Sequence, residues 1–310
     1  MNETAPRRHT AELPPPTLRV LLTGDRGHTG RWLRRRLERD GHQVVGFDIR
    51  DGHDIRDDAA VASVAAKTDV IIHCATLQWD HSGGDDDILH TNVRGAANVL
   101  AAAERAKHDR VVMFSSIQVL GVTDNSREPR SFPIRDSHER QPRNAYARSK
   151  AEIEDLCATF TARTGITTLC PRPVHIFVPG QAADTRRRWK RQPDREWVPA
   201  WGYGGFVDVR DVCSAVALAI SVPVEGHHRF ILCAADAAAS VTTLEAIQRF
   251  RPDVPCDANW PPTDEPNLSL FDTARARDLL GWAPVHTWAE GFNETLLTRA
   301  KRRLRQPFPV

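Results

Sequence analysis

Three evenly spaced glycines near the start of the chain constrain the fold more than any other feature. Gly24, Gly27 and Gly30 follow an apolar segment, residues 18–23, and precede an amphipathic segment, residues 31–40. The apolar run predicts a buried strand and the amphipathic run predicts a helix. The first glycine permits a tight turn, the second lets the backbone approach a phosphate, and the third lets helix pack on strand. The segment therefore predicts a strand-turn-helix unit with an anion site at the helix N-terminus.

The same alternation of strand and helix continues through the first two thirds of the chain. Further strands are predicted at 43–47, 69–74, 110–114, 167–170, the start of 206–220 and 229–233, with helices at 90–106 and 145–164. Strands joined through helices pair in parallel by right-handed crossovers. The sequence therefore predicts an α/β fold with a doubly wound parallel Rossmann sheet.

The alternation weakens beyond the fifth predicted strand, which indicates a second structural unit. We expect residues 17–177 plus 206–235 to form the dinucleotide-binding domain. Residues 178–205 plus 236–310 are expected to form a smaller, discontinuous C-terminal substrate-binding lobe. Residues 1–16 end in three prolines and lack the apolar core of a signal peptide, so they are predicted to be a disordered leader.

Composition excludes several classes of function. The net charge is +2, and basic residues are not interleaved with aromatic ones, so nucleic-acid binding is not expected. No apolar run approaches the roughly 18 residues of a membrane span. The six cysteines include no Cys-x-x-Cys pair, which argues against a disulfide framework or a metal site and favours a reducing, cytoplasmic location.

An aspartate at the end of the second predicted strand indicates which cofactor binds. Asp48 lies 18 residues beyond the last glycine of the turn, where a carboxylate can hold both ribose hydroxyls of a dinucleotide. It would repel a 2′-phosphate, so NAD is expected over NADP, although Arg26 and Arg50 could accommodate a phosphate. Arg26 is a candidate cofactor contact. Asp54 and Ile55 are candidates to reach the adenine, and an ordinary surface loop is the alternative for them.

A tyrosine–lysine pair supplies candidate chemistry. Tyr146, one of two tyrosines, stands four residues before Lys150, one of five lysines against 37 arginines. On a helix this spacing places both side chains on one face. An ammonium beside a phenol favours the phenolate and lowers a pKa that is otherwise about 10. The tyrosine could then take a proton from an alcohol near neutral pH; the alternative is an ordinary exposed helix turn.

Several further segments occur in a fixed order between residue 18 and about residue 293. They are Asp69–Ala75, Asn92–Leu100, Phe114–Gly121, Arg172-Pro173, Phe206–Val212 and Phe271–Trp282. With the glycine turn and the tyrosine–lysine pair, these segments make the chain resemble the extended short-chain dehydrogenase/reductases, the NAD-dependent epimerase/dehydratase family. The resemblance implies an enzyme that acts as a homodimer through helices 92–106 and 145–164.

The resemblance also implies roles for individual residues. Ser116 matches the hydroxyl residue that hydrogen-bonds the reacting oxygen, although a serine at a strand end can simply cap a turn. Tyr146 is expected to exchange a proton with substrate, and Lys150 to hold the nicotinamide ribose. Cofactor contacts are also expected at Ala75, Arg172 and Pro173.

Departures from the family pattern bear on the substrate. Ile117-Gln118 stands where dehydratases place an acid–base Asp-Glu pair, so dehydration is not expected, and Gln118 becomes a candidate substrate contact. Gly204 stands in place of an arginine that grips a diphosphate, and residues 261–267 contain no second arginine. Charge-assisted contacts to phosphate are strong, so a nucleotide-diphosphate handle is not expected.

Two further substrate candidates are open to two interpretations each. Arg187, in the basic cluster 186–191, could bind a carboxylate or phosphate, or could be part of a solvated helix face. His175 stands where the family often has a substrate-contacting asparagine, and could equally be a core histidine.

The sequence predicts an NAD-dependent oxidoreductase that removes hydride from a secondary alcohol of a sugar-like small molecule. A sugar epimerase acting through a transient ketone is the first alternative. A non-catalytic, dinucleotide-sensing regulator on the same fold is the second.

Overall fold

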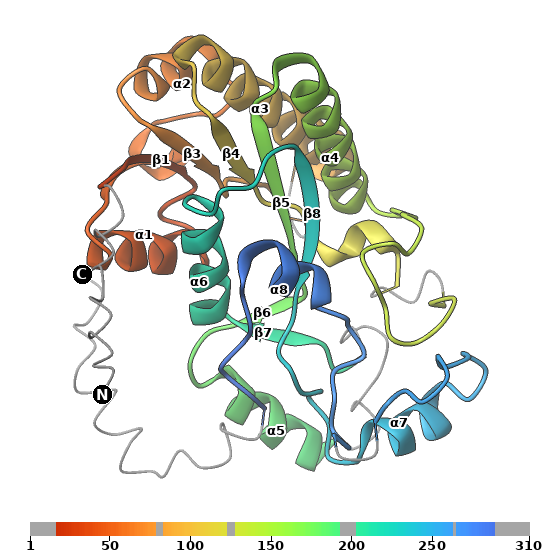
Figure 1. Cartoon of the computed structure of the whole chain (residues 1–310). Coiled ribbons are helices and arrows are strands. Elements are labelled where there is room, and N and C mark those ends of the chain that lie inside the picture. Colours follow the sequence, from red (N-terminus) through yellow and green to blue (C-terminus); the bar gives the residue numbers. More distant parts are fainter. Residues whose placement is uncertain (1–16, 79–82, 123–127, 193–202, 263–264, 289–310) are drawn as a thin grey trace, which may run out of the picture.

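Six parallel strands form the main sheet of the computed structural model, which describes residues 17–78, 83–122, 128–192, 203–262 and 265–288 (Figure 1). Their order across the sheet is β2-β1-β3-β4-β5-β8. The strands are β1 (Arg19–Thr23), β2 (Gln43–Phe47), β3 (Val70–His73), β4 (Arg110–Met113), β5 (Thr167–Pro173) and β8 (His227–Leu232). The predicted α/β fold with a parallel doubly wound sheet is confirmed.

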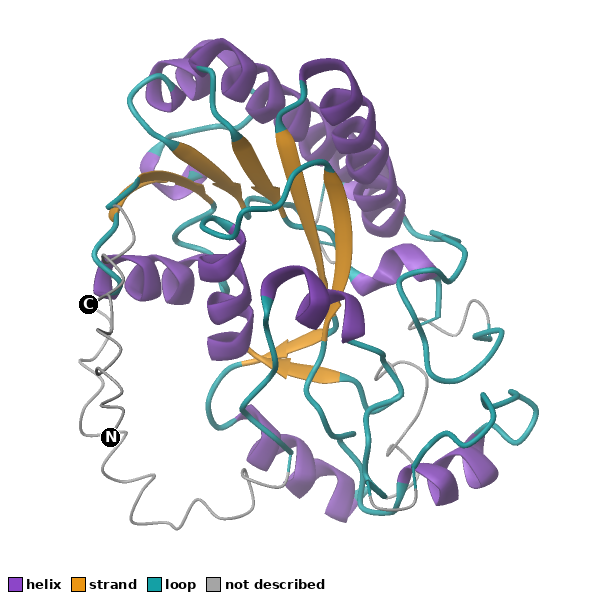
Figure 2. Cartoon of the chain, viewed as in Figure 1, coloured by secondary structure: helices purple, strands orange, loops and turns teal. Residues whose placement is uncertain are grey.

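Helices cover both faces of this sheet (Figure 2). On one face lie α2 (Asp58–Ala65), α3 (Gly84–Ala106) and α4 (Ala145–Thr164), and on the other lie α1 (Gly30–Arg39) and α6 (Val209–Ala219). Alternation along each strand divides the core: Leu21 belongs to the cluster with α2, α3 and α4, whereas Val20 and Leu22 belong to the cluster with α1 and α6. Burial on both faces explains why the strands are continuously apolar.

Two elements extend beyond the sequence prediction. Helix α3 begins at Gly84 rather than residue 90, and three aspartates, residues 85–87, occupy its first turn, where negative charge stabilises a helix dipole. Strand β5 continues to Pro173, although proline interrupts a sheet ladder. Only residues 167–169 of β5 pair with β4, while residues 168–173 pair with β8. The prolines therefore fall beyond the stretch that pairs with β4, where Ser115 N still donates to the Pro171 carbonyl oxygen at 2.9 Å.

A second, smaller sheet lies beyond the carboxyl ends of the main strands. It pairs β6 (His175–Phe177) with β7 (Phe206–Asp208). Helices α5 (Gln181–Arg191) and α7 (Thr243–Phe250) lie below this sheet in Figure 1, at the end of the molecule opposite α2. Helix α8 (Ala274–Leu280) lies beside β8. The division into two units stays a prediction. Residues 1–16, the predicted leader, lie outside the described residues.

The strand order places a ligand crevice. From β1 the chain crosses to β2 on one side and then to β3 on the other, so the order reverses at β1. In open parallel sheets ligands bind outside the carboxyl ends of the strands at this reversal. The segments after β1 and β3 are therefore the expected walls of a site.

A histidine is buried in the core beside this crevice. The side chain of His73, at the end of β3, is 1% exposed. Its Nδ1 lies 2.8 Å from Thr23 Oγ1, and its Nε2 has no hydrogen-bond partner among the described residues. Burial, assisted by the charge of Lys150, lowers the pKa of His73 to about 3. The imidazole is therefore neutral in the folded protein.

This burial predicts acid sensitivity. The folded-state pKa of His73 lies below the usual 6.5, so the unfolded chain binds more protons as the pH falls from 6.5 towards 3. The free energy of unfolding then falls by up to about 1.4 kcal/mol per pH unit from this group. We expect chemical denaturation of His73→Leu between pH 7 and pH 4.5 to show a correspondingly weaker pH dependence than the wild type. Ile72→Val, on the same strand, should shift the curve without changing its slope; parallel curves for His73→Leu would contradict the prediction.

Candidate functional site

A cavity of about 490 Å³ runs along the carboxyl ends of β2, β1, β3, β4 and β5. Its walls come from the glycine turn after β1, the segments after β2, β3 and β4, and the first turns of α4. The structure brings together here the following residues predicted from the sequence: Gly24, Gly27, Gly30, Asp48, Asp54, Ile55, Ala75, Tyr146, Lys150 and Pro173. Segments more than 100 residues apart in the sequence thus share one cavity.

The glycine turn is held against the segment after β3. Gly24 has a φ of +71°, and a Cβ there would lie 2.7 Å from the backbone N and Cα of Ala75. A Cβ on Gly30 would lie 2.0 Å from the carbonyl oxygen of Gly24. Both positions therefore require glycine, one for its conformation and for contact, the other for contact alone. The turn leads directly into the N-terminus of α1, where backbone amides favour an anion.

The Asp48 carboxylate lies in the wall of the cavity, with its two oxygens fixed by backbone amides. Oδ1 accepts from Arg50 N at 2.9 Å and Oδ2 accepts from Arg26 N at 3.2 Å. The Arg26 side chain pairs with Asp51, and the Arg50 guanidinium donates to the Arg26 carbonyl oxygen, each at 2.7 Å. Arg50 lines the cavity and Arg26 does not. A fixed acceptor with free lone pairs suits the hydroxyls of a ribose.

Helix α4 presents the tyrosine and the lysine to the cavity from one face. Its N-cap residue Asn144 accepts from Ala147 N at 2.7 Å, so the helix begins immediately before Tyr146. Lys150 Nζ donates to the Phe114 carbonyl oxygen at 2.9 Å and lies 5.7 Å from the centre of the Tyr146 ring. The Ser116 side chain favours the ionised form of the tyrosine hydroxyl and so acts to lower its pKa.

Ser116 has two contacts. It is the N-cap of the short helix η2 (Ile117–Leu120), where its Oγ accepts from Gln118 N at 3.2 Å. Its side chain also acts to lower the pKa of Tyr146. The capping interpretation and the partnership with tyrosine are thus both present. Ser116 does not line the cavity, whereas the preceding residue, Ser115, does.

Burial governs the pKa values of the pair. It raises the pKa of the Tyr146 phenol to about 12, and the hydrogen bond from Ser116 offsets only part of this rise. It lowers the pKa of Lys150 to about 8. The net fall in the tyrosine pKa that the sequence led us to expect is not found here, because burial disfavours the phenolate.

Arg172, a predicted cofactor contact, is turned away from the cavity. Its side chain is 0% exposed and forms two bonds with Glu154, Nε to Oε1 at 2.7 Å and Nη2 to Oε2 at 2.8 Å. The following residue, Pro173, does line the cavity. The end of β5 thus contributes its backbone and proline ring to the cavity, while the guanidinium stays in the core.

The three predicted substrate contacts lie outside the cavity. Gln118 Oε1 accepts from Asn144 Nδ2 at 3.2 Å, and His175 is exposed on β6 with its ring 5.1 Å from that of Phe177. Arg187 is exposed and paired with Asp184. Its neighbour Arg186 is the buried member of the basic cluster, 4.3 Å above the ring of Trp288.

Other cavity residues were missed by sequence reasoning. Those with polar side chains come mainly from the loops after β1, β2 and β3 and from α3: His28, Thr29, His53, Arg56, Thr76, Gln78, Asp87 and Thr91, with Ser115 after β4. Of these, only Ser115 carried a usable signal, because it directly precedes the predicted Ser116. Among the described residues no group of three or more His, Cys, Asp and Glu side chains could hold a metal ion, and none of the described helices is long and apolar enough to span a membrane.

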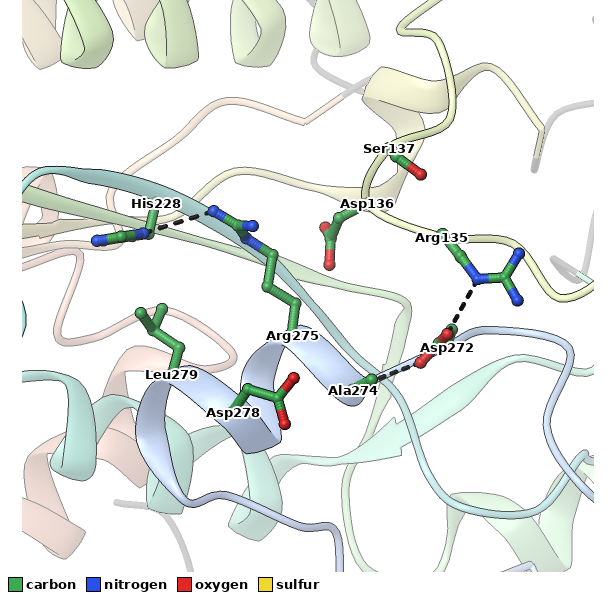
Figure 3. Close-up of a pocket in the computed structure, with 9 residues that line it drawn as sticks. All are labelled: Arg135, Asp136, Ser137, His228, Asp272, Ala274, Arg275, Asp278 and Leu279. Carbon is green, nitrogen blue, oxygen red and sulfur yellow. Dashed lines mark hydrogen bonds and ion pairs between the residues drawn. The ribbon is translucent and has the colours of Figure 1, made fainter.

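A second cavity, of similar volume, follows the free edge of β8 and shares no residue with the first (Figure 3). Two of its residues bond the edge strand: Asp136 Oδ2 accepts from Ile231 N at 3.1 Å, and Arg275 Nε donates to the Arg229 carbonyl oxygen at 2.7 Å. Burial raises the pKa of Asp136 to about 6. Asp136 and Arg275, two polar residues of this cavity, therefore provide hydrogen-bond partners for backbone groups at the edge of β8.

Residues 20–233 match the family described as NAD dependent epimerase/dehydratase. The protein Agl12 of low-salt glycan biosynthesis from Haloferax volcanii is 28% identical, over 64% of this chain and 71% of its own length. UDP-glucose 4-epimerase of Lactobacillus helveticus is 23% identical over 87% of this chain and 93% of its length, and uronate dehydrogenase of Pseudomonas putida is 30% identical over 51% and 60%. The match spans only 12% of the uncharacterized protein Rv2047c of Mycobacterium tuberculosis, at 36% identity.

Solved structures show the same fold. A short-chain dehydrogenase/reductase superfamily protein from Agrobacterium tumefaciens with bound NAD superposes with a TM-score of 0.70 at 20% identity, over 93% of this chain and 98% of that one. RMD from Pseudomonas aeruginosa, complexed with NADPH, gives 0.64 at 21% identity, over 90% and 99%. These neighbours bind NAD or NADPH.

The contact between the glycine turn and Ala75 predicts a specific loss of stability. Gly24 and Gly52 both have positive φ, but a Cβ on Gly52 would have no atom of the described residues within 4 Å. Gly52→Ala should therefore lose about 1–2 kcal/mol from conformational strain alone. In Gly24→Ala the free energy of unfolding, measured by chemical denaturation, should fall by about a further 1–3 kcal/mol, because the added methyl group overpacks the contact. Equal losses for the two variants would refute the close approach.

Proposed function

The chain belongs to the NAD-dependent epimerase/dehydratase family, and on this premise we propose that it is an NAD-dependent oxidoreductase acting on a secondary alcohol of a sugar-like small molecule. The observation that carries the proposal is the single cavity that unites the glycine turn and Asp48 with Tyr146 and Lys150. A dinucleotide has to reach from an anion site to a proton-transfer site, and this cavity connects the two.

The residues present fit such a cofactor. The glycine turn and the N-terminus of α1 would receive the pyrophosphate, Asp48 the ribose hydroxyls of the adenosine half, and Asp54 with Ile55 the adenine. Lys150 would hold the ribose next to the nicotinamide. When bound, the nicotinamide supplies the hydride acceptor; the chain supplies the proton chemistry.

Tyr146 would handle the proton of the reacting alcohol. The Ser116 side chain favours the ionised form of its hydroxyl, and the preceding residue, Ser115, lines the same cavity. For alcohol oxidation the phenol has to lose its proton, yet burial raises its pKa to about 12. The charged form of Lys150 favours that loss, and with a pKa of about 8 this lysine is largely charged near neutral pH.

Net oxidation is favoured over the alternatives because the chain lacks the acid–base pair of dehydratases and an arginine that would bind a substrate diphosphate. Ile117 is buried and cannot transfer a proton, which excludes it from a dehydratase role. Gly204 brings no arginine to a substrate diphosphate. A relative that oxidises a sugar acid, uronate dehydrogenase, is among the similar proteins. The non-catalytic regulator is disfavoured because Tyr146 and Lys150 are both in place.

Epimerisation is the second candidate, and one observation favours it. The match to a UDP-glucose 4-epimerase extends over 87% of this chain, well beyond the residues of the matched family. In that reaction the hydride returns to the other face of a transient ketone.

The same proposal includes the location and the oligomeric state of the enzyme: we propose a cytoplasmic homodimer formed through α3 and α4.

Hydride bookkeeping distinguishes the two candidates. With NAD and a panel of sugars, uronic acids and nucleotide sugars, we expect net NADH absorbance with one substrate class and loss of turnover by at least about a hundredfold in Tyr146→Phe, because general acid–base catalysis is removed. Tyr203→Phe, which changes the other tyrosine, is the control and should remain active. Isomerised product without net NADH would replace oxidation by epimerisation; full activity of Tyr146→Phe would overturn both.

Asp48 should set the cofactor preference. We expect NAD to bind at least about tenfold more tightly than NADP, equivalent to about 1.4 kcal/mol, and Asp48→Ala to remove most of this difference in calorimetric titrations. Asp57→Ala removes an aspartate that caps α2 in the same way, accepting from Ala60 N, and should leave the preference unchanged. Tighter binding of NADP to the wild type would contradict the assignment.

A further inference from the structure

Three side chains on one face of α4 hold three consecutive residues after β4. Tyr146, Lys150 and Glu154 are spaced by four residues, so they stack one turn above another. The contacts are those of Tyr146 with the Ser116 side chain, of Lys150 Nζ with the Phe114 carbonyl oxygen at 2.9 Å, and of Glu154 Oε1 with Ser115 Oγ at 2.6 Å. The first two belong to the proposed reaction, and the third has no role in it so far.

Glu154 is built into the core as a fixed carboxylate. Its side chain is 0% exposed, and Arg172 binds both of its oxygens. Arg140 and Arg229 lie at 3.4 and 3.6 Å from Oε2. Although burial raises the pKa of Glu154, the hydrogen bonds and charge of Arg172 hold it below its usual value. The acceptor for Ser115 is therefore ionised and has little freedom to move.

Arg172 is anchored in turn from the far side. Its Nη1 donates to the carbonyl oxygen of Asp136 at 3.1 Å and lies 3.4 Å from the carboxylate of the same residue. Asp136 lies in the cavity along β8 shown in Figure 3. A continuous set of polar contacts therefore runs from that cavity through Arg172 and Glu154 to Ser115, in the wall of the cofactor cavity.

Stability alone does not account for this arrangement. A buried ion pair is often no more stabilising than apolar side chains of similar volume. A pair that also fixes the neighbour of a reacting group has a further use, since reacting groups have to be held within fractions of an ångström.

We propose that Glu154 is a positioning residue, which fastens Ser115 so that the Ser116 hydroxyl and the Phe114 carbonyl stay aligned with Tyr146 and Lys150. The inference rests on the proposed function, because the alignment matters only if these groups react. No proton or hydride passes through Glu154. The helix and the strand end are joined at three successive points, and Glu154 is the one of the three helix residues that does not line the cofactor cavity.

The test uses Ser115→Ala, which removes the contact without leaving a buried charge unpaired. We expect kcat for NAD-dependent alcohol oxidation to fall about tenfold, with the KM for NAD and the melting temperature close to wild type. Ser214→Ala is the matched control, because it removes a hydroxyl that donates to the Asp211 carbonyl oxygen on α6 and accepts from Trp282 Nε1, and Ser214 does not line the cavity. Its kcat should be unchanged.

A second measurement does not depend on turnover. The chain has five lysines, so NMR of lysine labelled at the ε-carbon can follow Lys150 during a pH titration. Ser115→Ala should shift the pKa of Lys150 by at least about half a unit by displacing the Phe114 carbonyl, while Ser214→Ala should not. Glu154→Gln, which retains an acceptor for Ser115 but loses the charge that meets Arg172, should retain more kcat than Glu154→Ala.

The outcomes separate the two proposals. A wild type without hydride transfer, but with the Lys150 shift present, rejects the proposed function and keeps the positioning contact. Wild-type kcat and an unshifted Lys150 in Ser115→Ala overturn the positioning role. Parallel losses of kcat and melting temperature in both serine variants also overturn it, since they would indicate general destabilisation.

Discussion

The burial of a lysine ammonium between α4 and the end of β4 is the constraint on which the site depends. A charge in a medium of low polarity needs hydrogen-bond acceptors, and here the Phe114 carbonyl oxygen supplies one at 2.9 Å. That carbonyl is available because β4 ends one residue earlier, at Met113. The hydrogen bond of the lysine therefore depends both on where β4 ends and on where α4 lies against it. Burial also lowers the pKa of this lysine to about 8.

Much of the fold could be predicted because its signals are local. The glycine turn, the apolar runs and the range of α4 follow from the periodicity of the sequence and from turn chemistry. The position of the cavity follows from the rule that ligands lie at the carboxyl ends of parallel strands. Gly24, Asp48, Tyr146 and Lys150 meet there because each stands at such an end or on the helix that faces it.

What could not be predicted depends on the direction of long side chains and on solvation. Arg172 and Pro173 are neighbours in the sequence, but along a strand their side chains point to opposite faces, and only Pro173 reaches the cavity. On α5 the predicted Arg187 is exposed, whereas its neighbour Arg186, which points in another direction around the helix, is buried. The pKa of Tyr146 rises where a charge-pair argument expects a fall, because how far each group loses water is a property of the packed structure.

The polar contacts along β8 have a consequence for how the molecule meets copies of itself. An edge strand with open amides and carbonyls recruits other strands, which is the route to intermolecular β-sheet and to aggregation. On β8, the amide of Ile231 is occupied by Asp136 and the carbonyl of Arg229 by Arg275. Both side chains come from outside the strand, so the protection does not depend on its own sequence. The edge strand can thus contain the apolar residues Phe230, Ile231 and Leu232 without promoting aggregation through its open edge.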